Sequence, residues 1–395
     1  MSGQSGPVAP GRATTTAPAD PDILPALETP VPLVDLDRLE RNLDRVAGYA
    51  AEHRLRLRPH TKTHKSPRVL AAQIARGAVG ATVATRREAE VMASAADDVL
   101  LAYPAVGRAH AARAAAVAGR VRLTVALDSR RALDDLSDAC AAAGHEAGVL
   151  VEVDVGMGRC GVGEPRAAVE LARRTADLDG VRFDGVLFYP GHIRQPPAEQ
   201  VEDLDALDAR LEEFLAALGD AGLEAGTVSG GSTPTLFSSH LVGGQTEIRP
   251  GTYVYNDRTT AAIGACAWDD CAYTVLATVI STAVAGQAVV DAGSKALGRE
   301  PLRGGGEAGL GALLDRPDVV VARASEEHGI LDLPSTDWRP AVGDRVRIVP
   351  NHVCVSVALH EEVVGVRDGN EVERWRVEAR GRGPAAPPGE VRPIV

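Results

Sequence analysis

The residues with the clearest chemical potential form one basic segment, Arg58-Pro59-His60-Thr61-Lys62-Thr63-His64-Lys65. It follows a short apolar run and precedes Ser66-Pro67, a pair typical of a helix start. A loop that joins a strand to a helix lies on the active face of a βα protein. Lys62 is therefore suited to forming a Schiff base there. On residue types alone, a basic surface loop is the alternative.

A second reactive pair is His352 and Cys354, which are two residues apart in a Val-rich run that predicts a strand. Side chains at i and i+2 of a strand share a face, so an imidazole and a thiolate can bind one metal ion there. Only two protein ligands would leave positions open for water or substrate, as catalytic sites require. Thiolate plus imidazole favours zinc over manganese. Ordinary packing is the alternative.

Two further segments follow predicted strands and carry groups that bind anions. Gly230-Gly231-Ser232-Thr233 lets backbone N–H groups approach an anion and adds hydroxyl donors, which predicts a phosphate site. Arg159 follows Asp154 and a Gly-Met-Gly turn, so its guanidinium is expected over the barrel mouth. A plain turn and a structural salt bridge are the respective alternatives.

Aromatic and imidazole groups complete the candidate set. Tyr189 is expected to contact a cofactor, and His192, three residues later, is expected to act as a general base near its reactive face. A histidine that caps the next helix is equally compatible. Tyr253 follows Arg249-Pro250-Gly251 and is expected to close the phosphate site, or to be a core tyrosine.

These residues need a scaffold, and residues 23–260 alternate short β-branched runs with helical segments. This pattern predicts an α/β fold with a (β/α)₈ barrel, and an open doubly wound sheet is the alternative. The eight expected strands are Leu55–Arg58, Ala81–Ala84, Val99–Ala102, Leu123–Ala126, Leu150–Asp154, Gly185–Tyr189, Thr227–Ser229 and Glu247–Arg249.

Residues 261–395 lose the helical alternation and predict a separate β-rich domain that carries the metal pair. Its expected strands are Tyr273–Ala283, Gln287–Asp291, Asp318–Ala322, Asp344–Ile348, Val353–Leu359 and Val372–Val377. Residues 1–22 are rich in Ala, Pro, Thr and Gly and are expected to be a flexible tail.

Composition limits the partners. A formal net charge of −12 argues against nucleic acid or an anionic membrane as the main partner. The chain has no apolar stretch long enough for a signal peptide or a membrane span. The five cysteines form no disulfide framework, which is typical of a protein from the reducing cytoplasm. A small-molecule substrate is the expected partner.

Taken in order, these segments resemble the D-threonine aldolase and D-serine dehydratase family over roughly residues 30–365. The resemblance rests on the basic segment at 58–65, on Asp154–Gly161, on Val228–Thr235, on Arg249–Tyr253, on Asp291–Lys295, on Glu327–Gly329 and on Pro350–Cys354. It implies a fold type III, alanine-racemase-like architecture with pyridoxal phosphate (PLP) on Lys62. The residues expected to bind PLP are Lys62, His60, Arg159, Tyr189, Gly230, Gly231, Ser232, Thr233 and Tyr253.

The resemblance also implies a metal at His352 and Cys354, a homodimer, and a D-3-hydroxy amino acid as substrate. In family aldolases an aspartate tends to stand where this chain has Cys354, so the resemblance favours dehydration to a 2-oxo acid and ammonia. The alternatives are retro-aldol cleavage to glycine and an aldehyde, amino-acid racemisation, and a non-catalytic PLP-binding protein. The metal pair argues against a racemase, and the C-terminal β domain argues against the non-catalytic protein.

Overall fold

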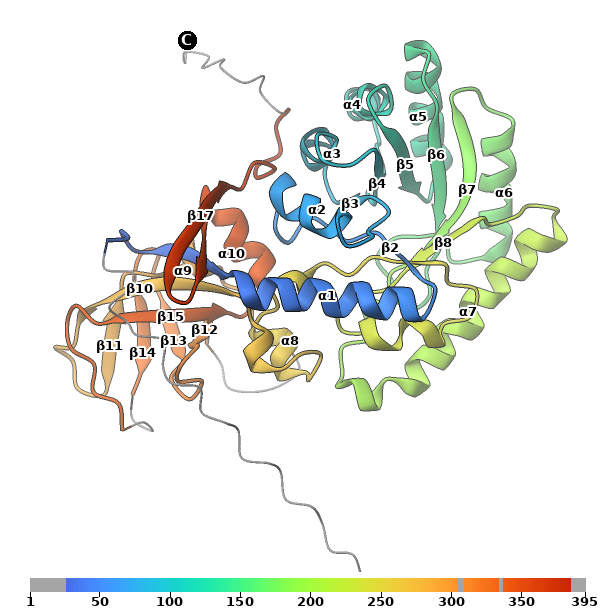
Figure 1. Cartoon of the computed structure of the whole chain (residues 1–395). Helices are drawn as coiled ribbons and strands as arrows, with labels where there is room; N and C mark the ends of the chain where they lie inside the picture. The colour runs from blue at the N-terminus through green and yellow to red at the C-terminus, as the bar shows by residue number, and fades with distance from the viewer. Residues whose placement is uncertain (1–25, 304–308, 334–336, 385–395) are drawn as a thin grey trace, which may run out of the picture.

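The computed structural model describes residues 26–303, 309–333 and 337–384. The expected tail at residues 1–22 lies outside these ranges. Two sheets organise the described chain, one inside a barrel and one in a β-rich domain beside it (Figure 1). Among the described residues, no helix combines the length and the apolar composition needed to span a bilayer.

The barrel contains an eight-stranded sheet in the order β2-β9-β8-β7-β6-β5-β4-β3. Its strands are β2 (Arg56–Leu57), β3 (Ala81–Val83), β4 (Asp98–Leu101), β5 (Arg122–Leu127), β6 (Ala147–Glu152), β7 (Val181–Leu187), β8 (Thr227–Gly230) and β9 (Glu247–Ile248). All of these pairs are parallel. A parallel bridge between His60 and Thr82 joins the β2 edge to the β3 edge. The predicted barrel is confirmed, and the open-sheet alternative is wrong.

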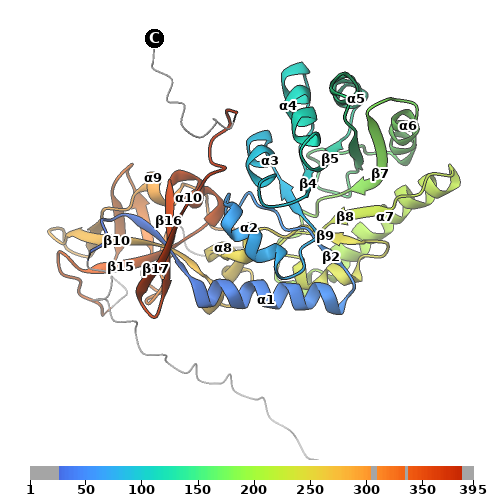
Figure 2. The same cartoon turned by 45° about the horizontal axis from the view of Figure 1, so that its top comes forward.

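Helices surround the barrel strands (Figure 2). They are α1 (Leu36–Glu52), α2 (Pro67–Ile74), α3 (Arg86–Met92), α4 (Arg108–Ala118), α5 (Arg130–Ala143), α6 (Pro165–Ala176), α7 (Val201–Asp220) and the short α8 (Arg258–Ala262). Local sequence explains several starts: Asp35 and Thr85 accept backbone N–H bonds at the starts of α1 and α3, and Pro67 occupies the first turn of α2.

The β-rich domain contains a nine-stranded sheet with the path β13-β14-β11-β10-β1-β16-β17, to which β15 and β12 are added beside β10. Its elements are β1 (Val31–Asp35), β10 (Tyr273–Ser281), β11 (Gln287–Val290), α9 (Ser294–Leu297), β12 (Gly311–Leu313), β13 (Val321–Ala324), β14 (Gly329–Asp332), β15 (Arg345–Pro350), α10 (Val353–Leu359), β16 (Glu362–Arg367) and β17 (Asn370–Arg376).

Strand β1 was not expected, and it pairs with β10 and β16 although it precedes the barrel in the sequence. Helix α1 then leads from this sheet to the barrel, so the two parts share the start of the chain (Figure 1). The division into residues 23–260 and 261–395 stays a prediction.

The predicted strand Val353–Leu359 is wrong, because these residues form helix α10. Its buried residues are Val353, Ser356 and Val357, which have helical spacing. Ser356 donates a hydrogen bond to the Ala296 carbonyl at 2.7 Å, so packing against α9 stabilises the helix. The β-branched residues favour a strand locally, but tertiary packing overrides that preference.

Candidate active site

Two adjoining cavities open where the barrel strands end. The lysine cavity has a volume of about 590 Å³ and is lined by His60, Lys62, Ala102, Glu152, Arg159, Leu187, Tyr189, Ser232, Thr233, Pro234, Arg249, Gly251 and Thr252. The histidine cavity, of about 640 Å³, is lined by Tyr189, Gly191, Ile193, Arg194, Ser232, Pro234, Thr252, Asp257, Thr259, Thr260, Ile263, Pro301, Arg303 and His352. Four residues line both cavities, so they are two parts of one depression.

Lys62 lies in the lysine cavity, in the loop that follows β2. The bridge from His60 to Thr82 and the bond from the Thr61 N–H to the Thr82 carbonyl fix this loop to β3. The Lys62 ammonium is 5.9 Å from the centre of the Tyr189 ring. His60 is buried, and burial, together with the charge of Lys62, lowers its pKa well below the ordinary value. His60 therefore lines the cavity as a neutral imidazole.

Arg159 reaches the same cavity from the loop after β6. Its guanidinium lies 4.9 Å from the centre of the Tyr189 ring and 3.9 Å from the Glu152 carboxylate. Glu152 is buried, which raises its pKa. The cationic groups of Arg159 and Lys62 thus both lie within cation–π range of the Tyr189 ring.

The loop after β8 builds a cradle. A Cβ at Gly230 would lie 2.1 Å from the Phe188 ring, and Gly231 has a φ of +86° that favours glycine. Ser232 and Thr233 line the lysine cavity. A larger residue at either glycine would displace the loop that presents these two hydroxyls.

Tyr253 does not present its phenol to the cavities. The buried phenol accepts a hydrogen bond from Gln73 at 2.9 Å, and burial raises its pKa. Its backbone N–H donates to the Thr233 hydroxyl at 3.3 Å. The phenol therefore lies as the core-tyrosine alternative expects, and a role of Tyr253 in closing the phosphate site stays a prediction.

Sequence reasoning missed Arg249, which lines the lysine cavity directly after β9. One terminal nitrogen donates to the Phe188 carbonyl at 2.6 Å, whereas Nε has no hydrogen-bond partner in the described chain. Burial lowers the pKa of Arg249 to about 10. Its place immediately after a barrel strand was a usable signal, because active residues of such barrels occupy that position.

His352 lies in the histidine cavity at the start of α10. Its Nδ1 is 3.0 Å from the Asp257 carboxylate, which is 99% buried at the side chain and also accepts bonds from the backbone N–H groups of Val353 and Thr260. A carboxylate behind a histidine fixes the ring orientation, as in many metal sites. No periodic pattern in the sequence pointed to Asp257.

Cys354 contacts Thr252, a residue that lines both cavities. Its sulfur is 3.2 Å from the Thr63 hydroxyl and 3.9 Å from the Thr252 hydroxyl. Cys354 raises the pKa of His352 to about 11 with help from Asp257. Burial opposes ionisation of Cys354, but His352 and Lys62 lower its pKa to about 7. The structure therefore brings the predicted pair together beside Lys62, although through a helix rather than a strand.

His192 is not brought into this site. It is exposed, lies against Gly156 and lines neither cavity. Among the residues that the structure describes, no group of three or more His, Cys, Asp or Glu side chains is arranged to hold a metal ion. Any metal here would have His352 and Cys354 as its protein ligands, with Asp257 behind the histidine.

Comparison with known proteins agrees with this arrangement. Residues 34–259 match the family described as alanine racemase, N-terminal domain, and residues 272–366 match the putative serine dehydratase domain. The chain is 32% identical to a D-threonine aldolase from Arthrobacter sp., covering 92% of this chain and 96% of that protein. It is 37% identical to a D-threo-3-hydroxyaspartate dehydratase from Delftia sp., covering 90% of this chain and 98% of that one.

Solved structures give the same result. A D-threonine aldolase from Filomicrobium marinum has a TM-score of 0.84 at 38% identity, covering 92% of this chain and 99% of that one. A cysteine-to-alanine mutant of a D-threo-3-hydroxyaspartate dehydratase, in a metal-free form, has a TM-score of 0.83 at 34% identity, covering 92% of this chain and 100% of that one. This chain therefore belongs to the D-threonine aldolase and D-serine dehydratase family of PLP-dependent lyases, with an alanine-racemase-type barrel followed by a serine dehydratase domain.

Proposed function

We propose that this chain is a PLP- and metal-dependent dehydratase that converts D-3-hydroxy amino acids to 2-oxo acids and ammonia. The observation that carries the proposal is the placement of Lys62 beside the His352–Cys354 pair. The charge of Lys62 acts on the Cys354 thiol, and Thr252, which lines both cavities, contacts the same sulfur. An amine and a pair of potential metal ligands in one depression suit a substrate that has an amino group on Cα and a hydroxyl group on Cβ.

The lysine cavity fits PLP. Lys62 supplies the amine that would bond to the PLP aldehyde, and the cradle at Gly230–Thr233 supplies donors for the PLP phosphate. Arg249 has an Nε without a hydrogen-bond partner in the described chain, which suits the polar edge of the PLP ring. The ligand pair fits zinc better than manganese, since thiolate is a soft ligand. When bound, PLP supplies an electron sink at Cα and the metal polarises the 3-hydroxyl.

The chain's own residues then divide the work. While substrate is bound, Lys62 would have a free Nζ next to Cα, where it takes the Cα proton. Arg159 and Tyr189 limit the space around Nζ. Asp257 keeps the His352 ring oriented while the 3-hydroxyl takes the proton that Lys62 has gained and leaves as water. This returns Lys62 to its neutral form, and a water molecule then hydrolyses the dehydrated product to the 2-oxo acid and ammonia.

Retro-aldol cleavage is the competing activity. One relative is named as an aldolase and another as a dehydratase. That route needs a base at the 3-hydroxyl rather than at Cα. The residue expected to provide it, His192, lines neither cavity. Dehydration needs a base at Cα, which Lys62 would provide, and a metal at the 3-hydroxyl, which His352 and Cys354 would hold, so the geometry favours dehydration.

The test is the fate of deuterium placed at Cα of D-threonine. Dehydration must release the label into water, whereas retro-aldol cleavage keeps the Cα–H bond and leaves the label in glycine. Mass spectrometry of products and recovered substrate separates these outcomes. Glycine that retains the label would overturn the dehydratase proposal. Recovered L-allo-threonine without label would instead indicate a racemase.

We also infer a homodimer in the cytoplasm. The five cysteines are all free thiols in the structure, as in a reducing compartment. Sedimentation of the purified protein tests the dimer.

A further inference from the structure

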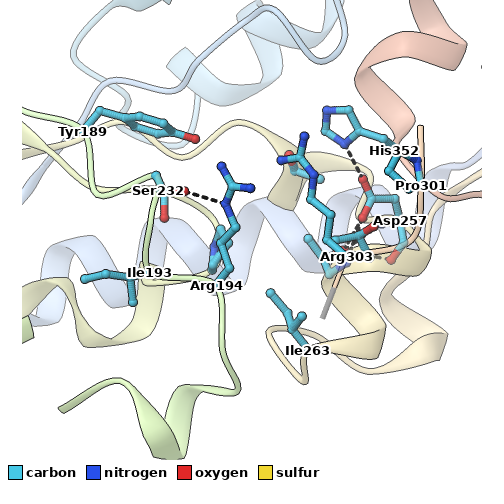
Figure 3. A pocket seen from close by; sticks show the side chains of 14 residues that line it. Tyr189, Ile193, Arg194, Ser232, Asp257, Ile263, Pro301, Arg303 and His352 are labelled. Atoms are coloured by element: carbon cyan, nitrogen blue, oxygen red, sulfur yellow. Dashed lines mark hydrogen bonds and ion pairs between the residues drawn. The ribbon is translucent and has the colours of Figure 1, made fainter. Parts of the chain in front are cut away.

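Two arginines line the histidine cavity without a carboxylate partner among the described residues. Arg194 comes from the loop after β7, and Arg303 follows α9. Figure 3 shows both guanidinium groups in the space between Tyr189 and His352. Arg58, Arg113 and Arg159 each pair with a carboxylate, but no ion pair involving Arg194 or Arg303 is found within residues 26–303, 309–333 and 337–384. A cavity lined by two such arginines is suited to binding an anion.

Arg194 is held in place by its own loop. Its Nε donates to the Gly191 carbonyl, and its backbone N–H donates to the Gln195 side chain at 2.9 Å. This leaves the two terminal nitrogens for a ligand, and two parallel N–H groups are the geometry that binds a carboxylate at both oxygens. Arg303 is exposed at the opposite side of the cavity, next to Pro301 (Figure 3).

The cavity's own carboxylate forms no ion pair with either arginine in the described chain. Asp257 is the acidic residue in the lining, and its oxygens already accept bonds from His352, from the Val353 N–H, and from the N–H and hydroxyl of Thr260. The remaining polar lining groups are neutral hydroxyls, such as those of Ser232 and Thr259. An incoming carboxylate would therefore meet uncompensated positive charge.

We propose that Arg194 and Arg303 bind a second carboxylate, attached to Cβ, and so select dicarboxylic D-3-hydroxy amino acids of the 3-hydroxyaspartate class. This inference rests on the proposed function for the orientation of the substrate. Cα must lie within reach of Lys62, so the α-carboxylate lies in the lysine cavity, where Arg159 is available. The 3-hydroxyl must lie near His352, so the other group on Cβ enters the cavity of the two arginines. The methyl group of D-threonine would leave both guanidiniums unpaired.

The test compares the wild-type holoenzyme with Arg194→Met and Arg303→Met, and uses Arg166→Met, an arginine with 90% side-chain exposure on α6, as the matched control. We expect wild type to prefer D-threo-3-hydroxyaspartate to D-threonine in kcat/KM. Each cavity variant should lose ~10- to 100-fold in kcat/KM for the dicarboxylate, as expected for a lost charged hydrogen bond. The value for D-threonine should change little. Equal losses for both substrates would overturn the proposal, because they would assign the arginines to the α-carboxylate.

A binding measurement separates this proposal from the lyase proposal. D-Aspartate and D-asparagine have nearly the same shape and differ in the charge at the second carboxyl position, and neither has a hydroxyl to eliminate. Calorimetry should show that the PLP-loaded protein prefers D-aspartate and that both cavity variants lose this preference. Equal binding of the two by wild type would overturn the carboxylate site. A preference for D-aspartate in a protein that turns over no 3-hydroxy amino acid would uphold the arginine site and overturn the lyase proposal.

Discussion

Lys62→Ala is expected to lower kcat by about 10³-fold or more, because the variant loses both the cofactor-binding amine and the Cα base. The visible absorbance of PLP bound to lysine should disappear from the purified protein at the same time. Both effects follow from the position of Nζ in the lysine cavity, 5.9 Å from the Tyr189 ring centre. Absorbance spectra and steady-state rates measure the two losses.

The matched variant is Lys62→Arg, which keeps the positive charge beside Cys354 but cannot form a Schiff base. It should lose activity as fully as Lys62→Ala while retaining the wild-type unfolding temperature. Lys295→Ala, an exposed lysine in α9, should leave rate and spectrum unchanged. A lysine-bound PLP spectrum that survives in Lys62→Ala would disprove the assignment.

Cys354→Ser is expected to remove the bound metal and to lower kcat/KM by about 10²-fold or more, because the metal's stabilisation of the leaving oxygen is worth several kcal/mol. The sulfur lies beside His352 and 3.2 Å from the Thr63 hydroxyl, so serine replaces it with little change in volume. Metal analysis of the dialysed protein gives the stoichiometry. EDTA treatment of the wild-type protein should reproduce the loss of activity. Added zinc should restore the activity of the wild-type protein more fully than that of the variant.

Asp257→Asn provides a graded version of the same test. Because Asp257 holds His352 Nδ1 at 3.0 Å, its loss should weaken metal affinity by ~10- to 100-fold without removing a ligand. Cys266→Ser, at a cysteine that lines neither cavity, is the control. Full metal content and activity in Cys354→Ser would show that the thiol is not a ligand.

The barrel strands could be predicted because each is a short apolar run followed by a helix signal, as at Ser66-Pro67 and Thr85. Lys62 could be predicted because its basic segment occupies the end of such a strand. Strand β1 could not, since its pairing with β10 depends on residues more than two hundred positions away. The prediction of a strand at Val353–Leu359 was wrong because the apolar residues of this segment fit both the strand period and the helix period. The contact with Ala296 favours the helix.

The candidate site shows the same limit. His352 and Cys354 were identified from the sequence because residues i and i+2 of a strand share a face. In the structure the segment is a helix, so that reason does not apply. Their partner Asp257 and the pair Arg194 and Arg303 have no local pattern, because three separate loops bring them to one cavity. His192 illustrates the converse: its chemistry suited a base, yet the loop after β7 turns it to the surface.

The measurement that tests the central claim most directly is product analysis of the purified protein loaded with PLP and zinc. D-Threo-3-hydroxyaspartate and D-threonine are the substrates, and L-threonine and an EDTA-treated sample are the controls. A Lys62 base beside the His352–Cys354 pair predicts ammonia with oxaloacetate or 2-oxobutanoate, from the D substrates alone and only with metal. Glycine with glyoxylate or acetaldehyde would contradict dehydration and would make the protein an aldolase.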